Sequence, residues 1–438
     1  MKVAVRRGAV ILGFVLVAAG CSSGSSDDDA VTTTSAGGIT TQTSTATPEE
    51  STTPTTGFVL DSGWEKANLD PTIFNDPEGS AMHWVTAGGP GFVAVGIDDA
   101  QTDVNAAVWT STDSINWTRV ADPDGIFGGP SRQVMTAVTA GGPGLVAVGF
   151  EGAPGEEQAA IWTSVDGPDW SRVPPDETIF GGEGLQAISS VTAGGPGLVA
   201  VGLDESAGDQ GAAAVWTSVD GLSWTRVPHD DDALGGPGEQ SMSSVTAGGP
   251  GLVAVGADRG AGTGDASAVW TSEDGLSWSR VPHDATIFEN INGQVVMFSV
   301  VAGGPGLVAV GADSGVSSGT AAAVWTSPDG FEWTRVPHVG SVFGGGSTTQ
   351  MLSVSAGDSG LVASGFDRSD TDPREADAVV WTSEDGLQWA RLPRDSATFG
   401  GQGFQSMLSV VVEGERAVGV GADLSVTGLG GAVWTFEG

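Results

Sequence analysis

Few side chains in this sequence combine the types and the spacing that catalysis or metal binding requires. The chain has four histidines, one cysteine and no tyrosine. His229, His283 and His338 each follow a Val-Pro dipeptide at one position of a repeated unit. Each of these histidines ends the outermost run of its unit, and the outermost runs of different units are expected to lie far apart. The ligands of one metal ion must instead converge on it. We therefore predict no shared metal site, and no Ser-His-Asp set, phosphate-binding loop or Cys/His cluster is present.

The repeated unit is the strongest signal in the sequence and predicts the elements that position these residues. The phrase Trp-Thr-Ser recurs every 53 to 56 residues, at Trp109, Trp162, Trp216, Trp270, Trp325 and Trp381, with Trp434-Thr-Phe as an altered seventh copy. A period near 50 is typical of solenoids and propellers. One unit holds four short extended runs, Met242 to Ala247, Leu252 to Gly256, Ala268 to Ser272 and Trp278 to Pro282. Without helical periodicity, these runs predict an all-β, seven-bladed β-propeller of four-stranded blades over residues 58–438.

The two ends of the repeat region predict how the ring closes. The last unit stops at Gly438, after its third strand. Gly63-Trp64-Glu65-Lys66 resembles an isolated fourth strand. We predict that this N-terminal strand completes the last blade, so that no sheet edge is left open. The repeated tryptophans are interpreted as core positions between blades, because large aromatic side chains dominate buried packing. The repeated first-strand methionines are interpreted as core or channel-lining positions.

The turn between the third and fourth runs reads Ser-x-Asp-Gly-x-x-Trp. Its aspartates are Asp113, where Ser114 replaces the glycine, and Asp166, Asp220, Asp274, Asp329 and Asp385. The motif resembles the Asp-box, or BNR, repeat of the sialidase-like propellers, in a variant one residue shorter between Asp and Gly. The resemblance implies a structural turn, in which the carboxylate accepts backbone N–H bonds, glycine supplies a positive φ and the aromatic ring anchors the turn.

The same resemblance raises the alternative of a glycan-active hydrolase. A sialidase-like mechanism implies a tyrosine nucleophile, a general-acid aspartate and three arginines that grip a carboxylate. The chain has no tyrosine, and six of its arginines follow the fourth-run tryptophan by two residues, as a structural repeat would. The sialidase mechanism is therefore not carried over. A hydrolase would need another carboxylate pair near the channel mouth, such as one that includes Glu151 or Asp204.

The connections on the opposite face of the propeller vary between units, and variable loops on a fixed scaffold are where specificity arises. The candidate ligand-binding residues on this face are His83, Trp84, Asp204, Asp230, Asp231 and Asp258. Trp84 lies outside the two repeated tryptophan positions, and it could stack on a ligand or plug the channel. Asp230-Asp231-Asp232 could hold Ca²⁺, although the spacing favours a solvated loop. No other cofactor is predicted, and the expected function is a binding or scaffold module.

The N-terminus predicts export and a lipid anchor. Lys2, Arg6 and Arg7 precede an apolar run that is too short to span a bilayer, which is typical of a signal peptide over residues 1–20. The run ends in Ala18-Ala19-Gly20-Cys21, which resembles the lipobox of bacterial lipoproteins. That resemblance implies a lipidated Cys21.

The rest of the chain sets its surroundings. Residues 21–57 are rich in Ser, Thr and Asp and predict a disordered tether. The formal net charge of −38 argues against nucleic acid as a partner. We expect a monomer on the extracytoplasmic side of the cell membrane, attached to that membrane only through its lipid, which binds a protein or glycan of the envelope.

Overall fold

The structure is a computed structural model that describes residues 63–438, except 71–73, 75–78, 101–102, 208–209, 261–264, 317–318, 369–371, 373 and 426–427. The predicted signal peptide, Cys21 and the predicted tether lie outside these residues. Within the described part of the chain, no helix has the length and hydropathy needed to cross a membrane.

The described residues form five four-stranded antiparallel sheets, which we call blades, and one eight-stranded sheet. The first two blades are β2 (Ser80–Gly88), β3 (Gly91–Ala100), β4 (Asp103–Ser111), β5 (Trp117–Arg119) and β6 (Arg132–Gly141), β7 (Gly144–Gly152), β8 (Gln158–Ser164), β9 (Trp170–Arg172). The next three are β10 (Gln186–Gly194), β11 (Gly197–Asp204), β12 (Ala212–Ser218), β13 (Trp224–Arg226); β14 (Gln240–Gly248), β15 (Gly251–Asp258), β16 (Ala266–Ser272), β17 (Ser279–Arg280); and β18 (Val295–Gly303), β19 (Gly306–Asp313), β20 (Ala321–Ser327), β21 (Thr334–Arg335).

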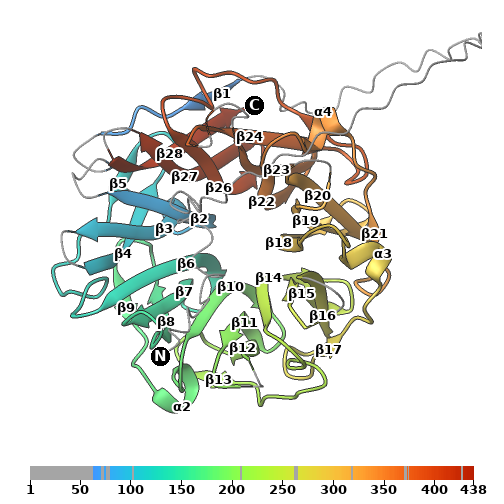
Figure 1. The fold of residues 1–438 in the computed structure, drawn as a ribbon. Coiled ribbons are helices and arrows are strands. Elements are labelled where there is room, and N and C mark those ends of the chain that lie inside the picture. The colour runs from blue at the N-terminus through green and yellow to red at the C-terminus, as the bar shows by residue number, and fades with distance from the viewer. Residues whose placement is uncertain are drawn as a thin grey trace, which may run out of the picture.

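The eight-stranded sheet consists of two halves. One half is β22 (Thr349–Gly357), β23 (Gly360–Arg368), β24 (Ala376–Ser383) and β25 (Ala390–Arg391). The other is β26 (Phe404–Glu413), β27 (Arg416–Ser425), β28 (Gly428–Glu437) and, beside β28, β1 (Trp64–Lys66). The single parallel pair of Ala376 with Phe404 joins the halves. The sheets are arranged around a centre as in a propeller, with β2, β6, β10, β14, β18, β22 and β26 innermost (Figure 1), so the predicted all-β propeller is confirmed at this level.

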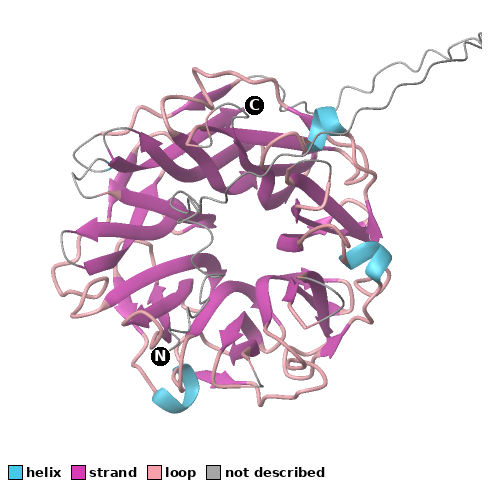
Figure 2. Ribbon diagram, in the orientation of Figure 1, coloured by secondary structure: helices cyan, strands magenta, loops and turns pink. Residues whose placement is uncertain are grey.

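Each connection from an outer strand to the next inner strand runs along the periphery of the ring. Among the described residues, three of these connections contain one helical turn, α2 (Glu177–Phe180), α3 (Ala285–Phe288) and α4 (Gly340–Phe343) (Figure 2). The side chains of Asp176 and Asp284 cap α2 and α3 by accepting the N–H of the residue two positions on. The phenylalanine that ends each helix is buried, so the connections close the outer edge of the core.

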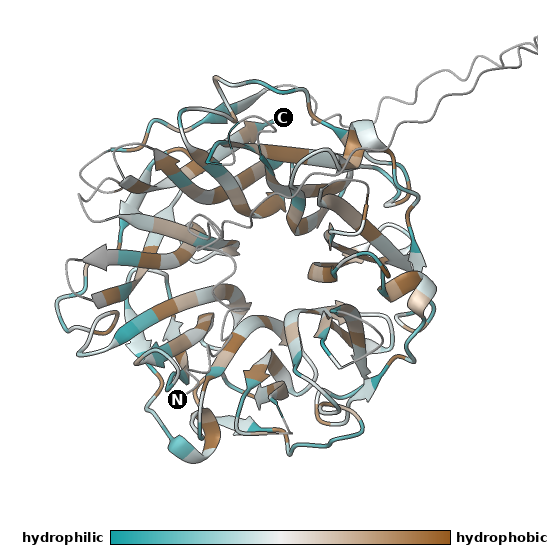
Figure 3. Cartoon of the chain, in the orientation of Figure 1, coloured by the Kyte–Doolittle hydropathy of each residue, from teal (hydrophilic) through white to brown (hydrophobic). Residues whose placement is uncertain are grey.

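The hydrophobic core lies between neighbouring sheets, and apolar residues follow the strands around the ring (Figure 3). Trp216 of β12 is fully buried against Val146 and Val148 of the preceding blade. Its indole Nε1 donates a 2.7 Å hydrogen bond to the carbonyl of Ile179, in the connection between the two blades. Met242 is also fully buried, beside Val201 of the blade before it. The predicted core role of the repeated tryptophans is confirmed, and of the two positions predicted for the methionines, core or channel lining, the structure shows the core.

The antiparallel order of strands gives the propeller two unlike faces. The turn face carries the turns from first to second and from third to fourth strand, and the loop face carries the remaining connections. On the turn face, the proline in the first-to-second-strand turn of one blade lies against the glycine in the third-to-fourth-strand turn of the next blade. A Cβ built on Gly221, which has φ +79°, would lie 2.9 Å from Pro143 Cδ. Only glycine fits this close approach without strain, so the uniform turn face is occupied by contacts between blades.

Candidate functional site

Two of the four carboxylates predicted for the loop face, Asp204 and Asp258, are engaged in buried ion pairs. Asp204, at the end of β11, is 2% exposed, pairs with Arg226 of β13 and accepts a 3.1 Å hydrogen bond from Gln186 Nε2. Asp258 pairs with Arg280 at 2.7 Å and accepts from Gln240 Nε2 at 3.0 Å. The same contact recurs as Asp98–Arg119, Glu151–Arg172, Asp313–Arg335, Asp367–Arg391 and Asp423–Lys66.

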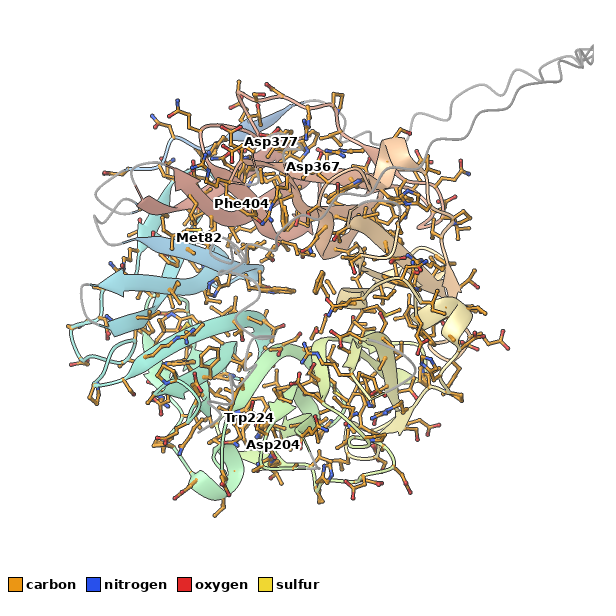
Figure 4. The ribbon with its side chains drawn as sticks, viewed as in Figure 1. Met82, Asp204, Trp224, Asp367, Asp377 and Phe404 are labelled. Carbon is orange, nitrogen blue, oxygen red and sulfur yellow. The ribbon has the colours of Figure 1, made fainter. Side chains whose placement is uncertain are left out.

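These ion pairs change the interpretation of two predicted ligand residues. A ligand that reached Asp204 or Asp258 would have to displace a paired arginine and a bonded glutamine, so both aspartates hold the blade together instead. Each arginine also lies over a buried tryptophan, with Arg226 Cζ 5.6 Å from the Trp216 ring. Burial lowers the pKa of the Arg226 guanidinium, yet arginine stays charged because its ordinary pKa is so high. Asp204 and Trp224 lie in the outer part of their blade (Figure 4).

Asp230 and Asp231 form a local turn at the start of the β13–β14 connection. Asp230 Oδ1 accepts the N–H of Asp232 at 3.0 Å, and its carbonyl accepts the N–H of Leu234 at 2.7 Å. Asp231 is largely exposed and bonds His229 Nε2 at 2.7 Å. Among the residues that the structure describes, no three His, Cys, Asp or Glu side chains are grouped so as to hold a metal ion. Calcium binding at this loop stays a prediction, and the contacts seen here are those of a turn.

The aspartates of the repeated third-to-fourth-strand turns are likewise engaged by their own backbone. Asp220 Oδ1 accepts the N–H groups of Leu222 and Ser223 at 2.9 and 2.8 Å. Trp224 Nε1 donates to the carbonyl of Gly221 at 2.9 Å. Bonds from the Ser223 and Leu222 N–H groups lower the pKa of Asp220, and the Asn116 side chain lowers that of Asp113 to about 2. Carboxylates held ionised within a turn are poorly suited to general-acid work.

A feature that the sequence did not predict distinguishes the inner strands from one another. Every described inner strand has a β-bulge directly after its repeated methionine, or after Ile188 in β10. A bulge leaves one residue out of the ladder and re-aims its side chain. We call these residues the bulge ring: His83, Thr136, Ser189, Ser243, Phe298, Leu352 and Leu408. Four consecutive members are polar and the next three are apolar, so the two halves of the ring differ in chemistry.

Two members of the polar half of the bulge ring, His83 and Thr136, contact the backbone of the following blade. His83 Nδ1 lies 2.9 Å from the carbonyl oxygen of Met135, and Thr136 Oγ1 donates to the carbonyl of Ile188 at 2.7 Å. Because a carbonyl only accepts, Nδ1 of His83 carries the proton. Its Nε2 is buried and has no partner among the described residues. Burial, together with the charge of Arg132, lowers the pKa of His83.

Trp84 occupies a position that is serine in most other inner strands. In those strands the hydroxyl accepts a backbone N–H from the next inner strand, as Ser190 Oγ does from Val245 at 3.3 Å. Trp84 instead packs, partly buried, against the core clusters on both sides of the β6–β9 blade. His83 and Trp84 directly follow Met82 on β2, and Figure 4 shows Met82 well apart from Asp204.

The apolar half of the bulge ring belongs to a separate cluster. Leu352 and Leu408 are buried with Phe366, and Phe298 and Phe404 pack against them. The guanidinium of Arg368, on the loop face, lies 5.5 Å from the Phe404 ring. The sequence signal that could have found the ring is the residue after each repeated methionine, the point where copies stop resembling one another.

Comparisons with known proteins agree with a β-propeller. Residues 183–303 match the family model of the DUF6242 beta propeller domain. No curated protein matches the sequence. Among solved structures, a Trypanosoma rangeli sialidase in complex with sialic acid is similar at 12% identity and a TM-score of 0.43, over 86% of this chain and 59% of that one. A WD40 beta propeller domain of Doa1 gives 10% and 0.42, over 85% and 96%.

A third similar structure is a putative glycoside hydrolase from Parabacteroides distasonis, at 11% identity and a TM-score of 0.36, over 86% of this chain and 97% of that one. The chain thus spans about 59% of the length of the sialidase. Likenesses this distant carry no argument about activity or ligand.

The structural role of the ion pairs can be measured with Arg226→Met, which keeps most of the aliphatic stem over Trp216 but leaves Asp204 charged and buried. We expect a loss of about 3 kcal/mol in the free energy of unfolding, because removing one partner of a buried pair strands the other charge. Arg416→Met is the matched control, since Arg416 is 48% exposed in its pair with Glu437, and should cost less than about 0.5 kcal/mol. Equal losses in urea denaturation of the two variants would contradict the assignment.

The buried imidazole of His83 predicts a pH dependence of stability. Its pKa in the folded protein lies below the unfolded value of about 6.5, so protonation favours the unfolded chain. This contribution is full above pH 6.5 and falls as the pH drops through 6.5 toward the folded pKa, by up to about 1.4 kcal/mol per pH unit. His83→Thr, with the residue found at Thr136, keeps the hydrogen bond and removes the titration. Between pH 7 and pH 5, the free energy of unfolding of the wild type should therefore fall by more than that of the variant. An equal fall in both proteins would argue against a buried His83 imidazole.

Proposed function

We propose that this chain is a lipid-anchored, extracytoplasmic binding module, built as a seven-bladed propeller with turns of the Asp-box type. Its ligand binds at the loop face around the bulge ring. The observation that carries the proposal is the contrast between the repeated positions, whose polar groups are engaged by internal contacts, and the bulge ring, which differs from blade to blade. In a binding module, loops and re-aimed side chains supply specificity while the scaffold stays constant.

The contacts between the two ends of the sheet series support seven blades in a closed ring. Ser409 Oγ of β26 accepts the N–H of Val85 of β2 at 3.3 Å, the same contact that Ser190 makes to Val245 within the series. Counting each half of the eight-stranded sheet as one blade gives seven. β1 then acts as the fourth strand of the seventh, and Lys66 reproduces the role of the arginines by pairing with Asp423 at 2.8 Å and lying 5.7 Å from the Trp434 ring.

The bulge ring favours a ligand with one polar and one apolar face, and a glycan of the cell envelope has this character. His83, Thr136, Ser189 and Ser243 offer an imidazole and hydroxyl groups, and Phe298 lies on the opposite, apolar half. Trp84, beside His83, adds an aromatic surface that is partly buried. Sugar rings present hydroxyl edges to hydrogen-bonding groups and C–H faces to aromatic rings, which matches this division of chemistry.

A hydrolase is less well supported by the same contacts. Glycoside hydrolysis needs two carboxyl groups about 5 to 9.5 Å apart across a bound sugar, with one able to give up a proton. Glu151 and Asp204, the residues considered for such a pair, are each held by an arginine of their own blade. Each carboxylate already has its partner, so neither is poised as an acid or nucleophile.

The binding proposal is tested by thermal melting of the full chain against envelope glycans, peptidoglycan fragments and divalent cations. A ligand that binds the native state raises Tm in a concentration-dependent way. We expect a glycan to raise Tm. In Trp84→Ser, its affinity should fall at least about tenfold, which corresponds to about 1.4 kcal/mol. Ser restores the residue of the other blades, and Val165→Ser, at a residue 75% exposed on the turn face, is the control. A shift that Trp84→Ser leaves intact places the ligand elsewhere, and no shift with any glycan redirects the search to a protein partner.

The anchor is tested separately with Cys21→Ser. Because Cys21 is the only cysteine, this change removes the one residue that could carry the thioether lipid. We expect the wild-type chain in the membrane fraction with a mass increase at its mature N-terminus, and the variant without that modification. Recovery of an unmodified wild-type chain from the soluble fraction would rule the anchor out, while leaving the binding proposal untouched.

A further inference from the structure

At most junctions of the ring, a turn from the next blade covers the first turn of the preceding blade. Pro305, in the β18–β19 turn, lies 3.2 Å from the position of a Cβ on Gly386, in the β24–β25 turn. The same Cβ would lie 2.9 Å from Val308 Cγ2 and 3.3 Å from Leu361 Cδ1. Pro90, Pro143, Pro196 and Pro250 make the equivalent contact with the glycine of the following blade. The covering turn thus closes a site formed by a proline and a valine.

The junction from β22–β25 to β26–β28 has no such cover. β28 and its neighbour β1 come from opposite ends of the described chain, so no turn can join them. Ser359 stands in the place of the proline, and Val362 in that of Val308. A hollow of about 430 Å³ lies here, lined by Ser359, Val362 and Val412 and by the β24–β25 turn up to Trp389. Its position and its lining identify it as the place that the absent turn would fill.

The two segments that flank the absent turn meet on this same face. The N–H of Gly438, directly after β28, donates to the carbonyl of Glu415 in the β26–β27 turn at 3.0 Å. Gly63, directly before β1, lies against Phe436, whose Cε2 is 3.4 Å from the position of a glycine Cβ. Gly63 therefore lies on the turn face, at the seam that holds the hollow.

We propose that Phe58-Val59-Leu60 docks in this hollow and replaces the missing turn. These are the three consecutive large apolar residues in a segment, 22–62, that otherwise consists mainly of Ser, Thr, Asp and Gly. The five residues from Phe58 to Ser62 span up to about 17 Å when extended, which is enough to cross one turn. Docking covers the partly buried Val412 with apolar side chains, beside Val362, which is already buried, and it ties the tether to the seam where β1 pairs with β28.

The test is thiol accessibility in the full chain carrying Cys21→Ser, which leaves an engineered cysteine as its one thiol. Val59→Cys is compared with Thr53→Cys, five residues before the docked tripeptide. We expect maleimide labelling of Val59→Cys to be about tenfold slower, which corresponds to about 1.4 kcal/mol of docking. Adding Ser359→Trp, a change at an exposed turn residue that fills the hollow, should return the labelling of Val59→Cys to the rate of Thr53→Cys.

Three results would overturn the proposal. Equal labelling rates for Val59→Cys and Thr53→Cys would show that the segment is not covered. Protection that survives Ser359→Trp, with an unchanged Tm, would place the segment elsewhere. Protection that grows with protein concentration would make the occupant a second copy. None of these results bears on ligand binding at the loop face, which is measured by the Tm shift.

Discussion

The buried ion pair between the second and the fourth strand is the contact on which the blades depend. The outer strands are only two or three residues long, as in β17 (Ser279–Arg280), so their ladder bonds alone cannot hold them. In each case a tryptophan anchors the start of the strand, and a cation two residues later pairs with the carboxylate that ends the second strand. Because the arginine also covers the third-strand tryptophan, one side chain links the second, third and fourth strands of the blade. Removing it would leave a buried carboxylate without its partner, which is costly.

This arrangement explains why an acidic protein keeps so few basic residues and where they go. Of the 16 lysines and arginines, the repeated ones are used between strands, and all but Arg119, whose side chain is 39% exposed, are partly buried. The acidic excess is left for the exposed turns and loops, where the carboxylates cap helical turns or accept backbone N–H bonds. Charge on this protein is therefore largely a matter of scaffold and solvation, and the side chains that differ between blades are instead those of the bulge ring.

The sequence predicted the sheets well because each blade repeats both its apolar pattern and its turn chemistry. Trp216 and Met242 were correctly assigned to the core for that reason. The candidate site was predicted less well, because variation between copies was read as exposure. Asp204 and Asp258 sit at strand ends beside variable loops, but their partners Arg226 and Arg280 come from a different strand and become visible only in the folded blade. The bulge at His83 places the core residues Met82 and Val85 three positions apart instead of two, and one such break in a short strand is too little for periodicity to reveal.

The position of β1 relates the proposed anchor to the proposed binding face. Trp64 pairs with Phe436 near the end of β28, on the turn face, so the chain enters the propeller from that side. Under the proposed anchoring at Cys21, the turn face would be the one toward the membrane, and the loop face, with the variable connections, would point away from it. The turn face, which is uniform between blades, would then be next to the membrane. The loop face, which differs between blades, would be the one that an envelope ligand can approach. The pairing of β1 with β28 thus links the proposed closure of the ring to the proposed orientation of the propeller.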